Sequence, residues 1–325
     1  MSQNSLRIVY MGTPEFAVAP LNALIESGCN VVGVVTNPDK PAGRGQKIQE
    51  SAVKKYALEK GLPILQPEKF RNENFLAELK ALNADLQVVV AFKMLPEMVW
   101  NMPKYGTLNL HASLLPHYRG AAPINWAIMN GDKESGVSTF LLQKEIDTGN
   151  VIFQEKVSIG ENDNLEVLHD KLMEIGSQLV VKTVCAIEAG DYPQIPQENL
   201  ITKGETLKTA PKIFKDDCKI NWSSTIDQIH NHIRGLSPYP AAWTELTDAN
   251  DKKVALKVYA AFKETEEHSH PIGALISDTK TYLKVAVDGG FINLTTIQMA
   301  GKKRMNIGDF LRGFQQITNY KLLID

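Results

Sequence analysis

The opening of the chain constrains the fold most, because it alternates between apolar runs of two different periods. LRIVYMG at 6–12 and NVVGVVT at 30–36 are short and rich in β-branched residues, as buried strands are. The segment between them has apolar side chains on one helical face, and we expect Thr13 to cap this helix, Pro14 to begin it and Gly28 to end it. A strand–helix–strand unit predicts an α/β domain with a mainly parallel sheet.

Later segments extend this domain. Strand-like runs occur at 61–66, 84–92, 107–112 and 137–143. Residues 162–189 carry an amphipathic pattern that predicts one long helix, ended by Gly190. The turn after the first strand reads MGTPEF rather than GxGxxG, so the sequence does not indicate a nicotinamide dinucleotide site.

The pattern changes after the long helix. Residues 190–207 are rich in proline and polar residues and are expected to form a linker. A helix stopped by prolines follows, and then short alternating strands with Gly and Asp turns, which predict a small β-barrel. We therefore expect an α/β domain over 1–189 and a second domain over 208–325.

Composition and charge narrow the class of protein. Three cysteines without a CxxC pair argue for a reducing compartment and against a disulfide framework. The N-terminus lacks a signal-peptide pattern and no apolar run approaches 18 residues, so we expect a cytoplasmic enzyme or binding protein without a membrane partner.

Charge is unevenly divided. The net charge is −2, but residues 208–325 hold 16 Lys and Arg against 13 Asp and Glu, or +3, leaving the first 207 residues at −5. A mildly basic C-terminal part is compatible with a polyanionic partner.

The stretch NLHASLLPHYRG at 109–120 indicates chemistry rather than packing. Asn109 and His111 are two apart on an expected strand, so they project from the same face. An amide and an imidazole aimed at one point can polarise a carbonyl and stabilise the oxyanion formed on attack. Asp147, in KEIDTGNV, can orient the imidazole and take up a proton. Each residue alone is more often structural, but together they favour acyl transfer without a covalent intermediate, because no GxSxG motif is present.

Residues 37–49, NPDKPAGRGQKIQ, form a second unusual stretch. Two prolines, two glycines and the cations Lys40, Arg44 and Lys47 predict a loop that is neither helix nor strand. Such a loop after a sheet strand is a place where α/β proteins bind ligands. Composition alone supports a solvated loop equally well.

NLHASLLPHYRGAAPINWAI, with IDTGNV after it, resembles the 10-formyltetrahydrofolate-dependent formyltransferases. The resemblance implies that Asn109, His111 and Asp147 are catalytic. It also implies 10-formyltetrahydrofolate as co-substrate and no metal, with the folate bordered by Ser113, Leu114, Leu115 and Pro116. FKMLPEMV departs from the family's more glycine-containing version, so no individual residues are carried over from that segment.

Within that family, the resemblance to the branch acting on methionyl-tRNA runs almost end to end. It is carried by MGTPEFA, NPDKPAGRGQK, GAAPI, APKI, INW, GLSPYPAAWT, AGKKRM and DFLRG. It implies a Rossmann-like mainly parallel domain followed by a smaller OB-like β-barrel, acting on initiator methionyl-tRNA in translation initiation, and we expect a monomer. The residues then expected to contact tRNA are Lys40, Arg44, Lys47, Lys302, Lys303 and Arg304, with Arg44 at the key position of a loop that enters the acceptor arm.

Other functions fit parts of the pattern. A formyltransferase acting on an amino sugar nucleotide would share the catalytic trio, although it needs no long basic loop. A purine-pathway formyltransferase would be shorter, and a non-catalytic RNA-binding protein would not need the trio. The pairs His230/His232 and His268/His270 do not indicate a metal site, because the first pair points to different helical faces and the second lies in a polar loop.

Overall fold

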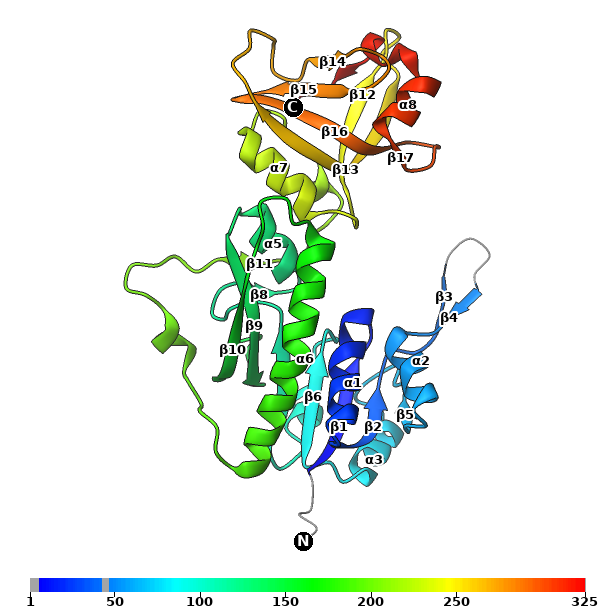
Figure 1. The fold of residues 1–325 in the computed structure, drawn as a ribbon. Helices are drawn as coiled ribbons and strands as arrows, with labels where there is room; N and C mark the ends of the chain where they lie inside the picture. The colour runs from blue at the N-terminus through cyan, green and yellow to red at the C-terminus, as the bar shows by residue number, and fades with distance from the viewer. Residues whose placement is uncertain (1–5, 43–46, 325) are drawn as a thin grey trace. The chain divides into compact units, whose positions relative to one another are not determined.

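The computed structural model describes residues 6–42 and 47–324, which form two compact units (Figure 1). Unit 1 contains the chain up to residue 120 together with 136–157 and 169–209. Unit 2 contains 121–135, 158–168 and the chain from residue 210 onward. Two short segments of the N-terminal half therefore pack with the C-terminal unit, a grouping that the order of the sequence does not reveal.

Unit 1 is built on a seven-stranded sheet whose order is β10-β9-β7-β6-β1-β2-β5. Its strands are β1 (Arg7–Gly12), β2 (Asn30–Val35), β5 (Ile64–Leu65), β6 (Leu86–Val90), β7 (Thr107–His111), β9 (Glu134–Leu141) and β10 (Val151–Ser158). The five strands from β7 to β5 are parallel, and β9 runs antiparallel to β7. The predicted Rossmann-like, mainly parallel sheet is confirmed, whereas β10 was not predicted.

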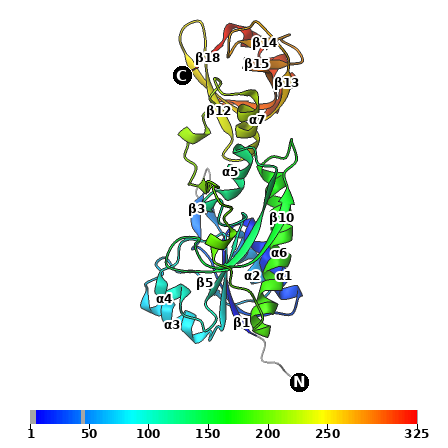
Figure 2. The same ribbon diagram turned by 90° about the vertical axis from the view of Figure 1, so that its left-hand side faces the viewer.

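Helices cover both faces of this sheet. Its helices are α1 (Val18–Glu26), α2 (Ala52–Glu59), α3 (Glu73–Ala81), α4 (Glu97–Trp100) and most of α6 (Leu165–Ala189). Figure 2 shows α3 and α4 on one face and α1 and α6 on the other. Successive β1 residues alternate between the faces, so Val9 and Met11 pack with Phe75 and Leu79 of α3.

The start of the first helix differs from the prediction. Pro14 is extended (ψ 176°) and precedes a short 3₁₀ turn, η1 (Glu15–Ala17), so α1 begins at Val18 and Thr13 does not cap it. Gly12 packs so closely under this turn that an added Cβ would lie 2.6 Å from the Cβ of Ala17. The close approach between turn and strand fixes the backbone there more strongly than the capping preference of Thr13.

The prediction that 37–49 contains no strand was wrong. β3 (Lys40–Ala42) pairs antiparallel with β4 (Lys47–Gln49). This two-stranded ribbon is separate from the main sheet, so it needs no alternating buried face, and Pro41 is tolerated because both strands are edges. The intervening residues, Arg44 among them, lie outside the described part of the chain.

Unit 2 is a nearly closed antiparallel barrel of the order β14-β15-β16-β13-β12-β18, with β17 paired to β16. Its strands are β12 (Ala242–Thr247), β13 (Lys253–Thr265), β14 (Leu275–Ser277), β15 (Leu283–Val287), β16 (Gly290–Met299), β17 (Met305–Asn306) and β18 (Lys321–Leu322). The barrel carries α7 (Ile226–Gly235), α8 (Ile307–Gly313), η3 (Asp216–Cys218) and η4 (Gln315–Asn319), while α5 (Pro123–Met129) packs on α7. The expected OB-like barrel is confirmed.

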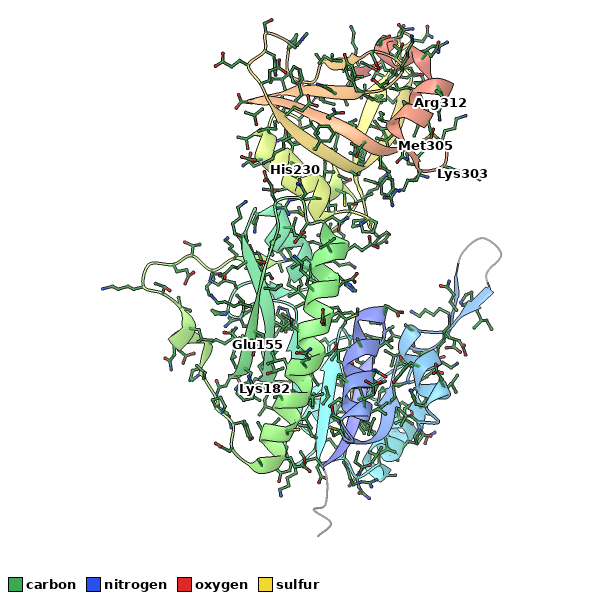
Figure 3. The ribbon with its side chains drawn as sticks, viewed as in Figure 1. Glu155, Lys182, His230, Lys303, Met305 and Arg312 are labelled. Atoms are coloured by element: carbon green, nitrogen blue, oxygen red, sulfur yellow. The ribbon has the colours of Figure 1, made fainter. Side chains whose placement is uncertain are left out.

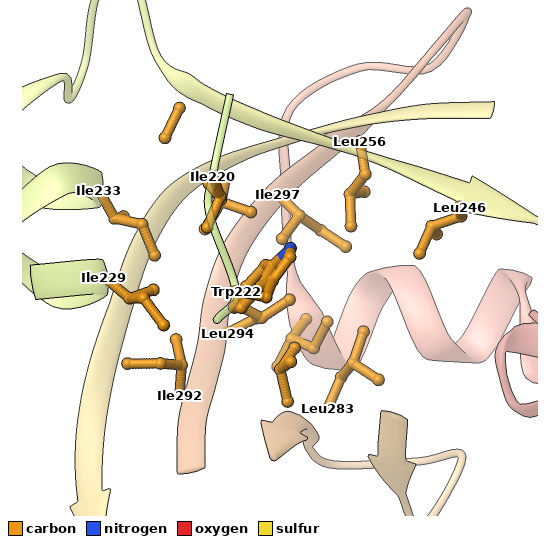
Figure 4. Packing of buried hydrophobic residues seen from close by; sticks show 14 of the residues in the cluster. Ile220, Trp222, Ile229, Ile233, Leu246, Leu256, Leu283, Ile292, Leu294 and Ile297 are labelled. Carbon is orange, nitrogen blue, oxygen red and sulfur yellow. The ribbon is translucent and has the colours of Figure 1, made fainter. Parts of the chain in front are cut away.

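The barrel core is centred on an indole. Trp222 is buried among side chains from facing strands and from α7, and Ile229, Leu256 and Leu294 are shown beside it in Figure 4. Its Nε1 donates to Thr244 Oγ1 at 2.9 Å, which satisfies its one polar group inside an apolar core. Thr225 and Gln228 form a capping box that begins α7.

No helix in the described ranges is long and apolar enough to cross a membrane.

Candidate active site

Strand geometry places Asn109 and His111 on one face, and a later turn brings Asp147 close to His111. Asn109 and His111 lie on one face of β7, and Asp147 lies in the turn between β9 and β10. His111 Nδ1 is 3.9 Å from Asp147 Oδ2, with side chains only 7% and 13% exposed. Asn109 is half-buried, and nothing in residues 6–42 or 47–324 hydrogen-bonds its carboxamide. The amide is thus available to a ligand beside the His–Asp pair.

One hydrogen bond fixes the tautomer of the His111 ring. Its Nε2 lies 2.8 Å from the backbone oxygen of Tyr118. A carbonyl only accepts, so Nε2 must carry a proton and Nδ1 faces Asp147. The 3.9 Å distance between Nδ1 and Oδ2 is too long for a direct hydrogen bond, so a proton passes between the two atoms through a group that lies between them.

Asp147 is held in an uncommon backbone conformation. Its φ is +55°, in the left-handed region, where Asp is one of the few tolerated side chains. Its Oδ2 accepts a 3.0 Å hydrogen bond from the backbone nitrogen of Gly120. Two residues later, an added Cβ on Gly149 would lie 1.8 Å from the carbonyl oxygen of Leu141, so the turn packs too closely against β9 for any other residue.

Most side chains of the segment expected to border folate, residues 113–116, are buried. Ser113 is fully buried; its Oγ donates to His117 O at 2.6 Å, and its own carbonyl accepts from Ser138 Oγ. Leu115 packs with Phe140 and Val151, and Pro116 is also buried. Only Leu114 is partly exposed, so a contact from this segment to a ligand must come from Leu114 or from the backbone.

A residue that the sequence did not single out completes the surroundings of Asp147. Gln197, at the start of η2 (Gln197–Leu200), is 2% exposed and belongs to the segment expected to be a linker. Its Nε2 donates to the carbonyls of Asp147 and Gly149, both at 2.8 Å, and its Oε1 accepts from Arg119. No sequence signal marked it, because a glutamine in a proline-rich polar stretch is ordinary.

The hairpin β3–β4 is anchored at its base. Lys40 is exposed on β3, whereas Lys47 begins β4 and its side chain is outside the described set. Asp39 accepts from Lys54 Nζ at 2.5 Å and from Gln66 Nε2 at 2.9 Å. The hydrogen bond from Lys54 lowers the pKa of the Asp39 carboxyl, and the same contact raises the pKa of Lys54. The base of the basic hairpin is therefore fixed to α2.

The outer face of the barrel carries a band of cations and aromatic rings. Trp243, Lys257 and Gln298 are directly opposite one another on β12, β13 and β16, so their side chains share the outer face. Lys215 and Lys219 lie over the Trp243 ring at 5.4 and 6.0 Å.

The band continues to the predicted basic turn. Arg304 lies 4.3 Å from the Tyr259 ring, and Tyr259 OH donates to Gln298 at 2.7 Å. Lys302 and Lys303 are exposed in the same turn, where Figure 3 labels Lys303. We call the set Lys215, Lys219, Trp243, Lys257, Tyr259 and Arg304 the basic band. The sequence predicted only its last member.

The histidine pairs do not form a metal centre in the described residues, which contain no group of three or more His, Cys, Asp or Glu placed to hold an ion. His230 is buried in α7, and burial together with the nearby Arg234 lowers its pKa to about 4. His268 instead hydrogen-bonds two backbone carbonyls near β16.

Comparison with known proteins identifies the family. Residues 6–184 match the formyl transferase family, and residues 212–315 match the formyl transferase C-terminal domain. The chain belongs to the formyl transferase family. The resemblance seen in the sequence is thereby confirmed.

This formyl transferase has close relatives over its whole length. It is 58% identical to the methionyl-tRNA formyltransferase of Parabacteroides distasonis over 321 residues, covering 98% of this chain and 99% of the relative. It is 56% identical to that of Bacteroides thetaiotaomicron over 322 residues, covering 99% and 100%. The solved sugar 3N-formyl transferase WlaRD, studied with dTDP and 5-N-formyl-THF, shares the fold with a TM-score of 0.64 at 21% identity, covering 93% of this chain and 100% of its own.

Proposed function

We propose that this chain transfers a formyl group from 10-formyltetrahydrofolate to the free α-amine of methionyl initiator tRNA. The observation that carries the proposal is the facing pair His111 and Asp147, with Asn109 on the same face of β7 as His111, in a chain that is 58% identical along its length to a methionyl-tRNA formyltransferase. We expect it to act as a monomer in the cytoplasm, where charged initiator tRNA is used.

Proton removal is the first requirement of the reaction. A protonated amine has no lone pair for attack, so the α-ammonium must first lose a proton. We assign its uptake to Asp147 and the facing Nδ1 of His111, which lie 3.9 Å apart. The Gly120 N–H bond to Oδ2 holds the carboxylate in place for this role.

Stabilisation of charge on the formyl oxygen is the second requirement. 10-Formyltetrahydrofolate supplies the formyl group when bound. As the amine adds to the formyl carbon, we expect the Asn109 carboxamide, which has no hydrogen-bond partner among the described residues, to donate to the developing oxyanion. Since His111 Nε2 is committed to Tyr118, His111 can donate only from Nδ1, once that nitrogen is protonated. Collapse then breaks the bond from the formyl carbon to N10 of the folate, and N10 takes up a proton.

The remaining residues are assigned to binding. We propose that the 113–116 segment shapes the folate site through its backbone and Leu114, since Ser113, Leu115 and Pro116 are buried within the unit. We assign 1–189 to catalysis, 190–207 to connection and 208–325 to tRNA binding. The basic band, Lys302, Lys303 and the hairpin residues Lys40, Arg44 and Lys47 supply cations for tRNA phosphates, which dominate affinity for nucleic acids.

Single-turnover formyl transfer from 10-formyltetrahydrofolate tests this function. Methionine-charged initiator tRNA is offered in one reaction and an amino sugar nucleotide in another. A third reaction offers the same tRNA with its methionine amine acetylated, as a matched control. We expect formylation of the free-amine tRNA alone. Transfer to the sugar nucleotide alone would overturn the substrate assignment while leaving the trio in place.

A further inference from the structure

We infer that Gln197 is a positioning residue for the reaction, acting on Asp147 from the proline-rich segment that follows α6 within unit 1. This inference rests on the proposed function of Asp147 as a proton acceptor. The residue lies 50 positions from Asp147 in sequence, yet its side chain is buried against the turn that carries the carboxylate.

The hydrogen bonds of Gln197 use its whole carboxamide. The two Nε2 protons go to the carbonyls of Asp147 and Gly149, each at 2.8 Å. Oε1 accepts from Arg119 at 2.6 Å through Nη2 and at 3.0 Å through Nε. A primary amide is the side chain that can donate twice and accept at the same time, so the site is matched to Gln rather than to Glu.

These bonds join the two supports of the Asp147 carboxylate. One support is the turn itself, where Asp147 has a φ of +55° and must be held in that conformation. The other is the Arg119–Gly120 strand β8, whose Gly120 N–H binds Oδ2. Gln197 hydrogen-bonds both the turn and Arg119 of β8. We infer that it thereby sets the distance between the turn and the strand, and with it the position of Asp147 Oδ2.

The segment that carries Gln197 is itself bound to the sheet of unit 1 just before this residue. Ile195 and Val151 exchange two backbone hydrogen bonds of 2.9 Å, which tie the segment to the first residue of β10. Gln197 follows two residues later, after Pro196 (φ −55°, ψ 134°). The backbone hydrogen bonds of Ile195 therefore fix the position from which the Gln197 side chain reaches Asp147.

The test variant is Gln197→Glu, which keeps the shape and the Arg119 contact but sets an oxygen against two carbonyl oxygens. We expect the single-turnover rate at saturating substrates to fall by about 10²-fold, the scale for small misplacements of a reacting group. Affinities for methionyl-tRNA and for the folate should stay at wild-type values. The exposed Gln194→Glu, three residues earlier in the same segment, is the matched control and should keep the wild-type rate.

A double-mutant cycle separates positioning from a general structural role. In an Asp147→Asn background, Gln197→Glu should cause no further loss, because the group it positions is already absent. An equal loss in both backgrounds would overturn the inference, as would a wild-type rate for Gln197→Glu alone. If the wild-type protein does not formylate methionyl-tRNA, the proposed function is wrong. That outcome is distinguishable from a failure of the inference about Gln197, which requires an active wild-type protein.

A second variant tests the inference if Gln197→Glu does not fold. Gln197→Met removes the donors at similar volume without adding charge, and should show the same loss of rate with unchanged substrate affinities. If thermal melting shows that neither variant folds while Gln194→Glu does, Gln197 is needed for the fold itself and the inference is overturned.

Discussion

Asp147 Oδ2 faces His111 Nδ1 at 3.9 Å while the other nitrogen of the same ring is bound to the backbone of Tyr118. The carboxylate is itself held by the N–H of Gly120. His111 is thus fixed by a backbone carbonyl on the far side of its ring, and Asp147 by a backbone N–H at the same oxygen that faces the ring. We expect the proton removed from the substrate amine to be taken up between these two groups.

Asp147→Asn should remove the proton acceptor while keeping the shape of the turn. We expect the rate of formyl transfer to fall by about 10²- to 10⁴-fold, the usual contribution of general base catalysis. Binding of tRNA, measured separately, should not change. The exposed Asp191→Asn is the matched control. Near-normal turnover of Asp147→Asn would remove this residue from the mechanism.

Arg44→Leu should affect tRNA use and leave the chemistry intact. The hairpin strands on either side of Arg44 are anchored through Asp39 and Lys54, so a change at 44 should not disturb the unit. We expect kcat/KM for methionyl-tRNA to fall, with folate affinity unchanged. An equal effect on a methionyl oligonucleotide too short to reach the hairpin would contradict this role.

The basic band should contribute to tRNA affinity through phosphate contacts. Lys257→Gln should weaken binding and reduce the slope of log K against log salt by roughly 0.9, the value for one lost phosphate contact. Lys280→Gln, at an exposed turn outside the band, is the control. If both variants show the wild-type slope, Lys257 makes no phosphate contact.

The buried His230 should make stability depend on pH. Its pKa is lowered from the usual 6.5 to about 4, mainly by burial and then by Arg234 and Lys263, while Glu161 and a hydrogen bond with Ala261 act in the opposite direction. Between these values the unfolded chain binds the proton and the folded chain does not, so stability falls as the pH decreases from 6.5 to 4. The full loss is about 3 kcal/mol.

Denaturant unfolding at pH 7.5 and pH 4.5 checks this dependence. His230→Gln should be less sensitive to pH than the wild type. Burial also lowers the pKa of His232, so part of the dependence should remain in that variant. An unchanged pH dependence in His230→Gln would show that this histidine is not its source.

The barrel core should respond to truncation in proportion to the volume removed. Trp222→Ala should destabilise unit 2 by about 3–5 kcal/mol, and Ile297→Val by about 0.5–1.5 kcal/mol. Both side chains are buried in the same cluster, and Trp222→Ala also removes the hydrogen bond to Thr244 Oγ1, which adds to the loss of volume. Equal effects in denaturant unfolding would contradict the central place of Trp222 in Figure 4.

Much of the fold could be predicted from the sequence, because local patterns and global packing agree there. The strands β1, β2, β6 and β7, the long helix α6 and the barrel strands β12 to β16 follow from their periodicity, whereas the short strands β17 and β18 were not predicted. The predictions were wrong where tertiary packing overrides the conformational preference of a single residue. Thr13 was a good cap by type, but the close packing of Gly12 against Ala17 decided that turn.

The sequence by itself determined which chemistry is available: the residue types Asn109, His111 and Asp147, their two-residue spacing on a strand, and the family they indicate. Only the tertiary structure decided how that chemistry is held. The conformation of Asp147 and the bridge from Gln197 depend on contacts between residues 50 positions apart, and no local pattern encodes them. Side-chain hydrogen bonds to backbone carbonyls depend on where the fold places those carbonyls, and any residue type can supply a carbonyl.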